Sequence, residues 1–164
     1  LVTFHGPMVK SNMLYDYDDF TKKSFEKAIN MKKEFLLENP PGENFQVMIP
    51  GYAQGIIIGG NLSLLTSMIG TPYEIDTREK ILFIEEVEEN VHHIDRIIFG
   101  DFTNCRNPYD KNYTVIEVLK DILKDYKKPV MYNIQSGHCF PMATIPLGAK
   151  CIMDTNHGLI KFTK

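Results

Sequence analysis

Strand-like and helix-like patterns of apolar and polar residues follow one another along the chain. Lys80–Ile84 and Ile97–Phe102 are continuous apolar runs, which is the pattern of strands buried on both faces. Pro129–Asn133 is a third strand, and Leu1–Phe4 and Phe45–Ile49 are shorter ones. The pattern therefore predicts several buried strands separated by helical segments.

Three helices are predicted between these strands. Lys22–Leu37 has apolar residues on one side and Thr21 as a candidate N-cap. A second helix has Asn61 at its N-cap and Gly70 just past its end. Thr114-Val115-Ile116-Glu117 has the spacing of a capping box that opens a third, amphipathic helix.

Two irregular segments separate and close these elements. Asn39-Pro40-Pro41-Gly42-Glu43-Asn44 cannot continue a helix, because consecutive prolines remove backbone donors, and we interpret it as a linker. Near the C-terminus, Lys150–Met153 and Leu159–Phe162 flank the turn-forming segment Asp154-Thr155-Asn156-His157-Gly158, which predicts a closing hairpin.

Composition limits the class of protein. The 164 residues are 43% hydrophobic with a mean hydropathy of −0.20, as in a globular protein that can bury a core. A net charge of −3 argues against nucleic acid, and no apolar run approaches a membrane span. Cys105, Cys139 and Cys151 are an odd, widely spaced set, which favours a reducing, cytoplasmic setting. The chain begins without Met on an apolar segment, so we expect it to begin inside a longer gene product.

The segment NIQSGHCFP, which begins at Asn133, places His138 in a loop directly after a predicted strand. On residue type alone, a lone histidine near a strand end is more often structural than catalytic. Gly137 permits a backbone conformation closed to other residues, and loops on buried strands commonly carry functional groups. These two features make His138 a candidate catalytic residue.

A pair of carboxylates, Glu85 and Glu86, follows the apolar run that ends at Ile84. Side chains alternate along a strand, so Glu85 shares the face of Phe83 while Glu86 points the other way, and at most one faces a given histidine. The pair can mark a solvent-exposed strand end, or one member can be a buried carboxylate that orients an imidazole.

A catalytic histidine–glutamate pair needs a nucleophile or a metal ion, and the sequence contains no clear candidate for either. Cys139 adjoins His138, but neighbours in an extended segment point apart, and Ser136 lies across a glycine from the histidine. His92-His93 lacks the spacing of a zinc site. Gly59-Gly60-Asn61 before a helix could receive an anion, although helix capping explains it equally well.

Four motifs follow one another over the whole chain. They are Thr3-Phe4-His5-Gly6-Pro7-Met8, Gly59-Gly60-Asn61-Leu62-Ser63-Leu64-Leu65 with Gly70-Thr71-Pro72, Ile81-Leu82-Phe83-Ile84-Glu85-Glu86-Val87, and Gly137-His138 with Ile145-Pro146-Leu147-Gly148. Ile94-Asp95-Arg96 and Phe99-Gly100-Asp101-Phe102 also fit. In this combination and order they resemble the motifs of the LD-carboxypeptidases, serine peptidases of a group that includes the microcin C immunity peptidase.

The resemblance implies a fold and a site. The family spreads a Ser–Glu–His triad over a Rossmann-like N-terminal domain, which supplies the serine, and a C-terminal α/β domain. The latter is of the swivelling β/β/α type, with a mixed sheet or flattened barrel. By motif match, Glu85 is the triad glutamate, His138 is the triad histidine, and Asn61 is a substrate contact. No metal or other cofactor is implied.

The same match divides the chain. Residues 1–38 would be the tail of the nucleophile domain, a strand–helix remnant; 39–55 would be the linker, and 56–164 the C-terminal domain. The family's serine lies upstream of the first motif, so we expect the nucleophile to lie outside this chain. Members usually carry an extra helix between the Ile-Asp-Arg motif and the Gly-Asp-Phe strand, whereas here Ile97 directly follows Arg96.

The expected function is that of the C-terminal part of a cytoplasmic serine-type LD-carboxypeptidase, which removes the terminal D-alanine from murein tetrapeptides in peptidoglycan recycling. Two alternatives stay open: a microcin-immunity-type carboxypeptidase acting on peptide-nucleotide antibiotics, and a non-catalytic binding domain. The expected partners are the murein peptide and the missing N-terminal domain of the same protein. A homodimer is a further candidate, and neither nucleic acid nor a membrane is expected.

Overall fold

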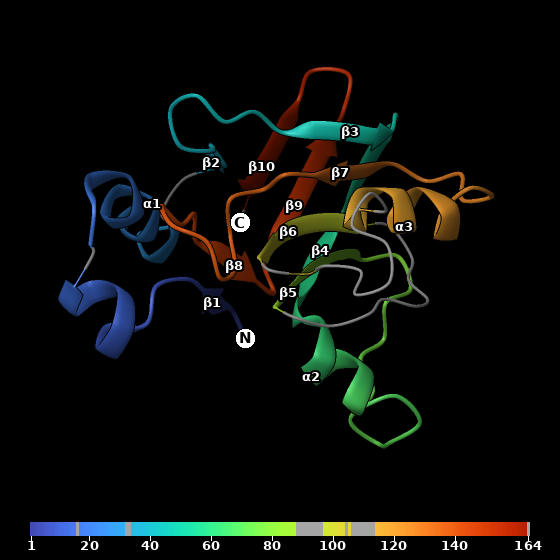
Figure 1. Ribbon diagram of the computed structural model, residues 1–164, viewed down its shortest axis with the longest axis horizontal. Helices are drawn as coiled ribbons and strands as arrows, with labels where there is room; N and C mark the ends of the chain where they lie inside the picture. Colours follow the sequence, from blue (N-terminus) through green and yellow to red (C-terminus); the bar gives the residue numbers. More distant parts are fainter. Residues whose placement is uncertain (16, 32–33, 88–96, 104, 106–113, 164) are drawn as a thin grey trace.

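The computed structural model describes residues 1–15, 17–31, 34–87, 97–103, 105 and 114–163 (Figure 1). Its helical elements are η1 (Val9–Met13), α1 (Asp19–Ile29), α2 (Leu62–Ser67) and α3 (Val115–Ile122). Its strands are β1 (Thr3–His5), β2 (Phe35–Leu36), β3 (Gln46–Ile49), β4 (Tyr52–Asn61), β5 (Ile81–Val87), β6 (Ile97–Thr103), β7 (Val130–Tyr132), β8 (Ile145–Leu147), β9 (Lys150–Asp154) and β10 (Leu159–Thr163). None of the described helices is long and apolar enough to cross a membrane.

Eight of the described strands form one mixed sheet in the order β2-β10-β9-β4-β5-β6-β7-β3, and β1 pairs separately with β8. The long strand β4 joins two parts of the sheet: Tyr52–Ile56 pair antiparallel with β9, and Ile57–Asn61 pair parallel with β5. The α/β fold with a mixed sheet is thus confirmed. Among the described strands the sheet is not closed, with β2 and β3 at its two edges, so of the two predicted forms the structure has the mixed sheet.

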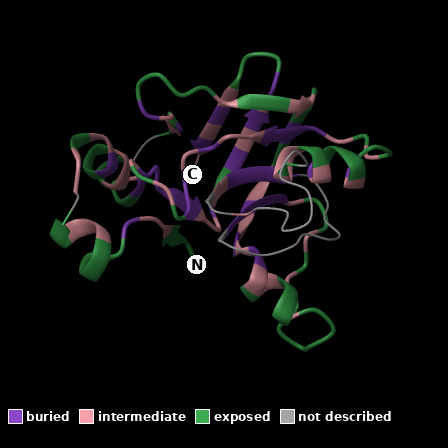
Figure 2. Ribbon diagram, in the orientation of Figure 1, coloured by how far each residue is buried: buried purple, intermediate pink, exposed green. Residues whose placement is uncertain are grey.

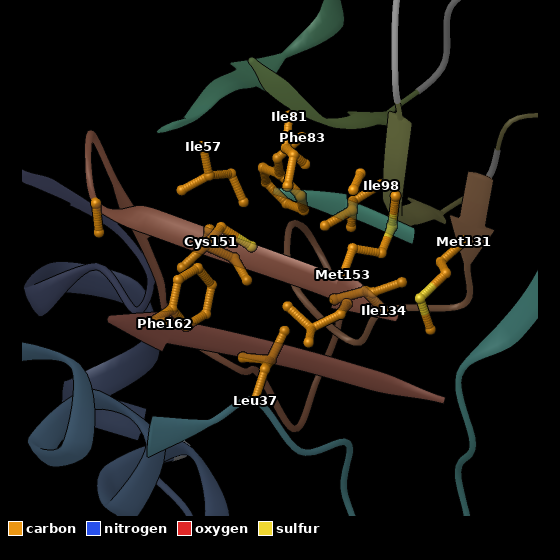
Figure 3. Close-up of a cluster of buried hydrophobic side chains, with 14 of the residues drawn as sticks. Leu37, Ile57, Ile81, Phe83, Ile98, Met131, Ile134, Cys151, Met153 and Phe162 are labelled. Atoms are coloured by element: carbon orange, nitrogen blue, oxygen red, sulfur yellow. The ribbon is translucent and has the colours of Figure 1, made fainter. Parts of the chain in front are cut away.

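Two apolar clusters lie on opposite faces of β5. One holds Ile81 and Phe83 together with residues of β9 and β10, whose side chains point toward β5 and β6 in Figure 3. The other holds Leu82 and Ile84 together with residues of α2 and α3. Figure 2 shows these central strands as buried and the outer sides of the helices as exposed. The continuous apolar run therefore reflects burial on both faces, as predicted.

Close approach of β4 to β5 depends on Gly59. This residue has φ +130°, and a Cβ there would lie 1.8 Å from the carbonyl oxygen of Phe83, so only glycine fits. The pairing places Asn61 beside Glu85 in the register of the two strands. Two residues singled out in separate motifs are thereby brought to the same end of the sheet.

The first predicted helix needs correction at both ends. Its N-cap is Asp18, whose carboxylate accepts hydrogen bonds from the backbone N–H groups of Phe20 and Thr21. Thr21 is buried inside the helix, where its hydroxyl donates to Asp18 and accepts from the backbone N–H of Met142. The helix ends at Ile29, and Phe35–Leu36, which were predicted to be helical, instead form β2 and pair with β10.

Among the other local predictions, Asn61 is confirmed as the N-cap of α2, but the helix ends at Ser67 with Met68 as its C-cap, so the predicted place of Gly70 just past its end is wrong. Both reciprocal hydrogen bonds of the capping box between Thr114 and Glu117 are present at α3. β9 and β10 form the predicted terminal hairpin.

The division of the chain at residues 38 and 55 stays a prediction. Within the predicted linker, Gln46–Ile49 forms β3 and pairs with β7 at the edge of the sheet. His92-His93, Ile94-Asp95-Arg96 and the position of the family's extra helix lie outside the described residues.

Candidate active site

The carboxylate of Glu85 and the imidazole of His138 meet near the end of β5. Nδ1 of His138 lies 2.7 Å from Oε2 of Glu85. The Glu85 side chain is 0% exposed and the His138 side chain is 52% exposed. An ionised carboxylate can only accept a hydrogen bond, so Nδ1 donates and is the protonated nitrogen of the neutral ring. Nε2 then faces away from Glu85 and is left as the acceptor.

Gly137 allows the loop to reach the carboxylate. It has φ +125°, and a Cβ at this position would lie 2.8 Å from both Cβ and Oε2 of Glu85. The loop backbone therefore packs directly on the carboxylate, and the next residue, His138, can place its ring against it. Within the described part of the chain, Oε1 of Glu85 has no hydrogen-bond partner.

His5 is a residue near this pair that sequence reasoning did not select. Its ring meets Phe83 edge-on, with the ring centroids 5.3 Å apart, on the face of β5 that also carries Glu85. Burial lowers the pKa of His5, the Glu85 carboxylate raises it and the charge of His138 lowers it; the net shift is downward, which favours the neutral ring. Only its place in the first motif could have signalled it, since β1 and β5 are far apart in the sequence.

Glu86 points to the other face of β5, as the alternation predicts. It is 2% exposed. Its Oε1 accepts from Nδ2 of Asn61 at 3.0 Å, and its Oε2 accepts from the backbone N–H and the hydroxyl of Ser63, each at 2.7 Å. The first turn of α2 is thus occupied by a carboxylate of the chain itself. Of the two interpretations of the Gly59–Asn61 turn, the structure shows helix capping.

The two neighbouring side chains that could act as nucleophiles are poorly suited to that role. Ser136 is 0% exposed, and its hydroxyl has no hydrogen-bond partner among the described residues, so it is not paired with His138 there. Burial, and then the carboxylates of Asp101 and Glu85, raise the pKa of Cys139 to about 12. Its thiol therefore stays protonated at neutral pH, whereas the thiolate is the nucleophile.

Comparison with known proteins identifies the family. Residues 54–98 and 96–153 match the family described as the LD-carboxypeptidase C-terminal domain. The chain belongs to the LD-carboxypeptidase family. The two matched stretches meet at the place where Ile97 directly follows Arg96.

Named relatives come from two groups. The probable murein peptide carboxypeptidase of Bacillus subtilis (strain 168) is 38% identical to this chain, over 94% of the chain and 54% of the relative. The Microcin C7 self-immunity protein MccF of Escherichia coli is 28% identical, over 70% of the chain and 38% of the relative. The chain therefore spans little more than half of the Bacillus protein.

A solved structure supports the fold. The crystal structure of muramoyltetrapeptide carboxypeptidase from Oxalobacter formigenes superimposes with a TM-score of 0.78 at 23% identity, over 99% of this chain and 62% of that one. At this level of identity the likeness establishes the shared fold alone.

A methyl group at position 137 tests the contact between loop and carboxylate. We expect Gly137→Ala to lower the free energy of unfolding by about 1–3 kcal/mol more than Gly42→Ala, because overpacking adds to backbone strain. Gly42 is the matched control, since it also has a positive φ, +93°, but has no atom within 4 Å of the added Cβ. Urea unfolding measures both variants, and equal losses would contradict the close packing.

The raised pKa of Cys139 predicts slow alkylation. At pH ~8 an ordinary thiol of pKa ~8.5 is about one quarter thiolate, so we expect iodoacetamide to modify Cys139 at least ~100-fold more slowly than the unfolded protein. Labelling should accelerate as the pH rises toward 12. Mass spectrometry of the Cys139 peptide follows the reaction, and the same reaction in urea is the control. Rapid labelling of the folded protein would contradict the raised pKa and make Cys139 a candidate nucleophile again.

Proposed function

We propose that this chain is the C-terminal part of a serine-type LD-carboxypeptidase, with Glu85 and His138 as two members of its triad. One observation carries the proposal: a fully buried carboxylate lies 2.7 Å from Nδ1 of a half-exposed imidazole. In Ser–His–acid hydrolases such a carboxylate holds the tautomer of the ring and stabilises the imidazolium that forms during the reaction.

The proposed roles follow from this contact. Nε2 of His138 takes the proton from a serine hydroxyl supplied by the N-terminal domain, as that oxygen attacks the carbonyl carbon of the terminal peptide bond. His138 then gives the proton to the leaving amine. Glu85 remains ionised and compensates the charge of the ring, and the donors that stabilise the oxyanion come from the N-terminal domain.

We propose murein tetrapeptides as the substrate, with release of the terminal D-alanine in the cytoplasm during peptidoglycan recycling. The names of the Bacillus and Oxalobacter proteins support this substrate class. The three free cysteines support a reducing compartment. Asn61, beside Glu85 at the end of β4, is proposed as a substrate contact.

The likeness to MccF supports a second candidate, an immunity-type carboxypeptidase that acts on peptide-nucleotide antibiotics. The two candidates share the proposed triad and differ in the group next to the scissile bond. Offering a murein tetrapeptide and a peptide-nucleotide conjugate to the same full-length gene product separates them by which one is cleaved.

Kinetics of D-alanine release by the full-length gene product test the triad. We expect His138→Ala to lower kcat at least ~1000-fold and Glu85→Gln at least ~100-fold, because the first removes the base and the second the group that orients it. His157→Ala and Asp154→Asn are matched controls. These two residues form another histidine–carboxylate pair at 2.7 Å, exposed in the β9–β10 hairpin, so their variants should stay within ~3-fold of wild type.

A non-catalytic domain would give no D-alanine release from the wild-type protein. Near-normal turnover of His138→Ala would exclude His138 as the base. A kcat unchanged in Glu85→Gln would show that this carboxylate has no role in orienting the ring.

A further inference from the structure

A second buried carboxylate lies next to the proposed triad glutamate and has no role in the proposed reaction. Glu86 is 2% exposed and belongs to the same strand as Glu85, on the opposite face. Burying a carboxylate is costly unless hydrogen-bond donors replace water. Among the described residues, Asn61 and Ser63 supply such donors, at the junction of β4 and α2.

These hydrogen bonds determine which way the Asn61 amide faces. Its Oδ1 accepts from the backbone N–H of Leu64 at 3.2 Å, and its Nδ2 donates to Oε1 of Glu86 at 3.0 Å. A backbone N–H requires an acceptor and an ionised carboxylate requires a donor, so the reversed amide would lose both bonds. An amide nitrogen carries two hydrogens, and the direction of the second is fixed by the first.

The other oxygen of Glu86 ties the carboxylate to α2. Oε2 accepts from both the N–H and the hydroxyl of Ser63, which leaves the carboxylate little freedom to rotate. Asn61 also pairs in register with Glu85. The amide is therefore hydrogen-bonded to the residue that directly follows the proposed triad glutamate on β5.

We propose that Glu86 is a positioning residue for substrate binding: it orients the half-buried amide of Asn61 so that the second N–H donates to an oxygen of the peptide substrate. This inference rests on the proposed function, in which Asn61 contacts the substrate. Glu86 acts only through Asn61 and takes no part in proton transfer.

The test is steady-state kinetics of D-alanine release from a murein tetrapeptide by the full-length gene product. In Glu86→Gln one oxygen becomes an NH₂ group facing a donor, so the amide of Asn61 loses its fixed direction. We expect KM to rise about 5- to 10-fold, the worth of one hydrogen bond, with kcat within ~3-fold. The pH profile of kcat should be unchanged, because the contact between Glu85 and His138 is untouched.

A second variant separates positioning from general stability. Asn61→Ser keeps an N-cap for α2 but lacks the amide donor, so it should raise KM at least as much as Glu86→Gln. In the Asn61→Ser background, Glu86→Gln should then change KM by less than ~2-fold, because its effect passes through Asn61. Ser67→Ala is the control: it removes an exposed side-chain hydrogen bond from the same helix and should leave KM unchanged.

The outcomes are distinct. The proposal is supported if Glu86→Gln raises KM in the wild-type background and has little further effect on KM in the Asn61→Ser background. An unchanged KM in Glu86→Gln, or a full additive effect in the Asn61→Ser background, overturns it while leaving the proposed function intact. A wild-type protein that releases no D-alanine would contradict the proposed function, and this inference with it. If Glu86→Gln is too unstable to assay, Glu86→Asp enters the same comparison, because it withdraws the carboxylate by one methylene.

Discussion

Burying the Glu85 carboxylate removes it from water, at a cost of several kcal/mol unless a partner takes the place of the solvent. The ring of His138 is that partner, at 2.7 Å, and the loop that carries it can come so close only because residue 137 has no side chain. A half-exposed histidine is thereby held by a fully buried acid. This asymmetry supports a role for the ring in proton transfer with a group that approaches from outside.

The strand β5 organises both halves of the proposed site. Its side chains alternate between the cluster shared with β9 and β10 and the cluster beneath α2 and α3. The two glutamates at its end follow the same alternation, so Glu85 faces the imidazole while Glu86 faces the first turn of α2. The two consecutive carboxylates can thus have separate roles: Glu85 orients the proposed base, His138, and Glu86 orients the proposed substrate contact, Asn61.

Much of this arrangement follows from local rules. The period of two in a strand predicts that only one glutamate faces His138, and the caps at Asn61 and Thr114 depend on residues within the same turn. Long-range contacts decide what the sequence could not predict. Phe35–Leu36, at the end of the first predicted helix, pair with β10 as a strand, and the packing of His5 on Phe83 joins strands that no spacing rule connects.

Nitrogen NMR of the His138 ring tests the central claim most directly. In the full-length gene product, at a pH where the ring is neutral, Glu85 should hold the proton on Nδ1 and leave Nε2 as the basic nitrogen. Glu85→Gln should shift the ring away from this tautomer. A wild-type ring that carries its proton on Nε2 would contradict the account, because such a ring could not accept a proton from an attacking serine on that side.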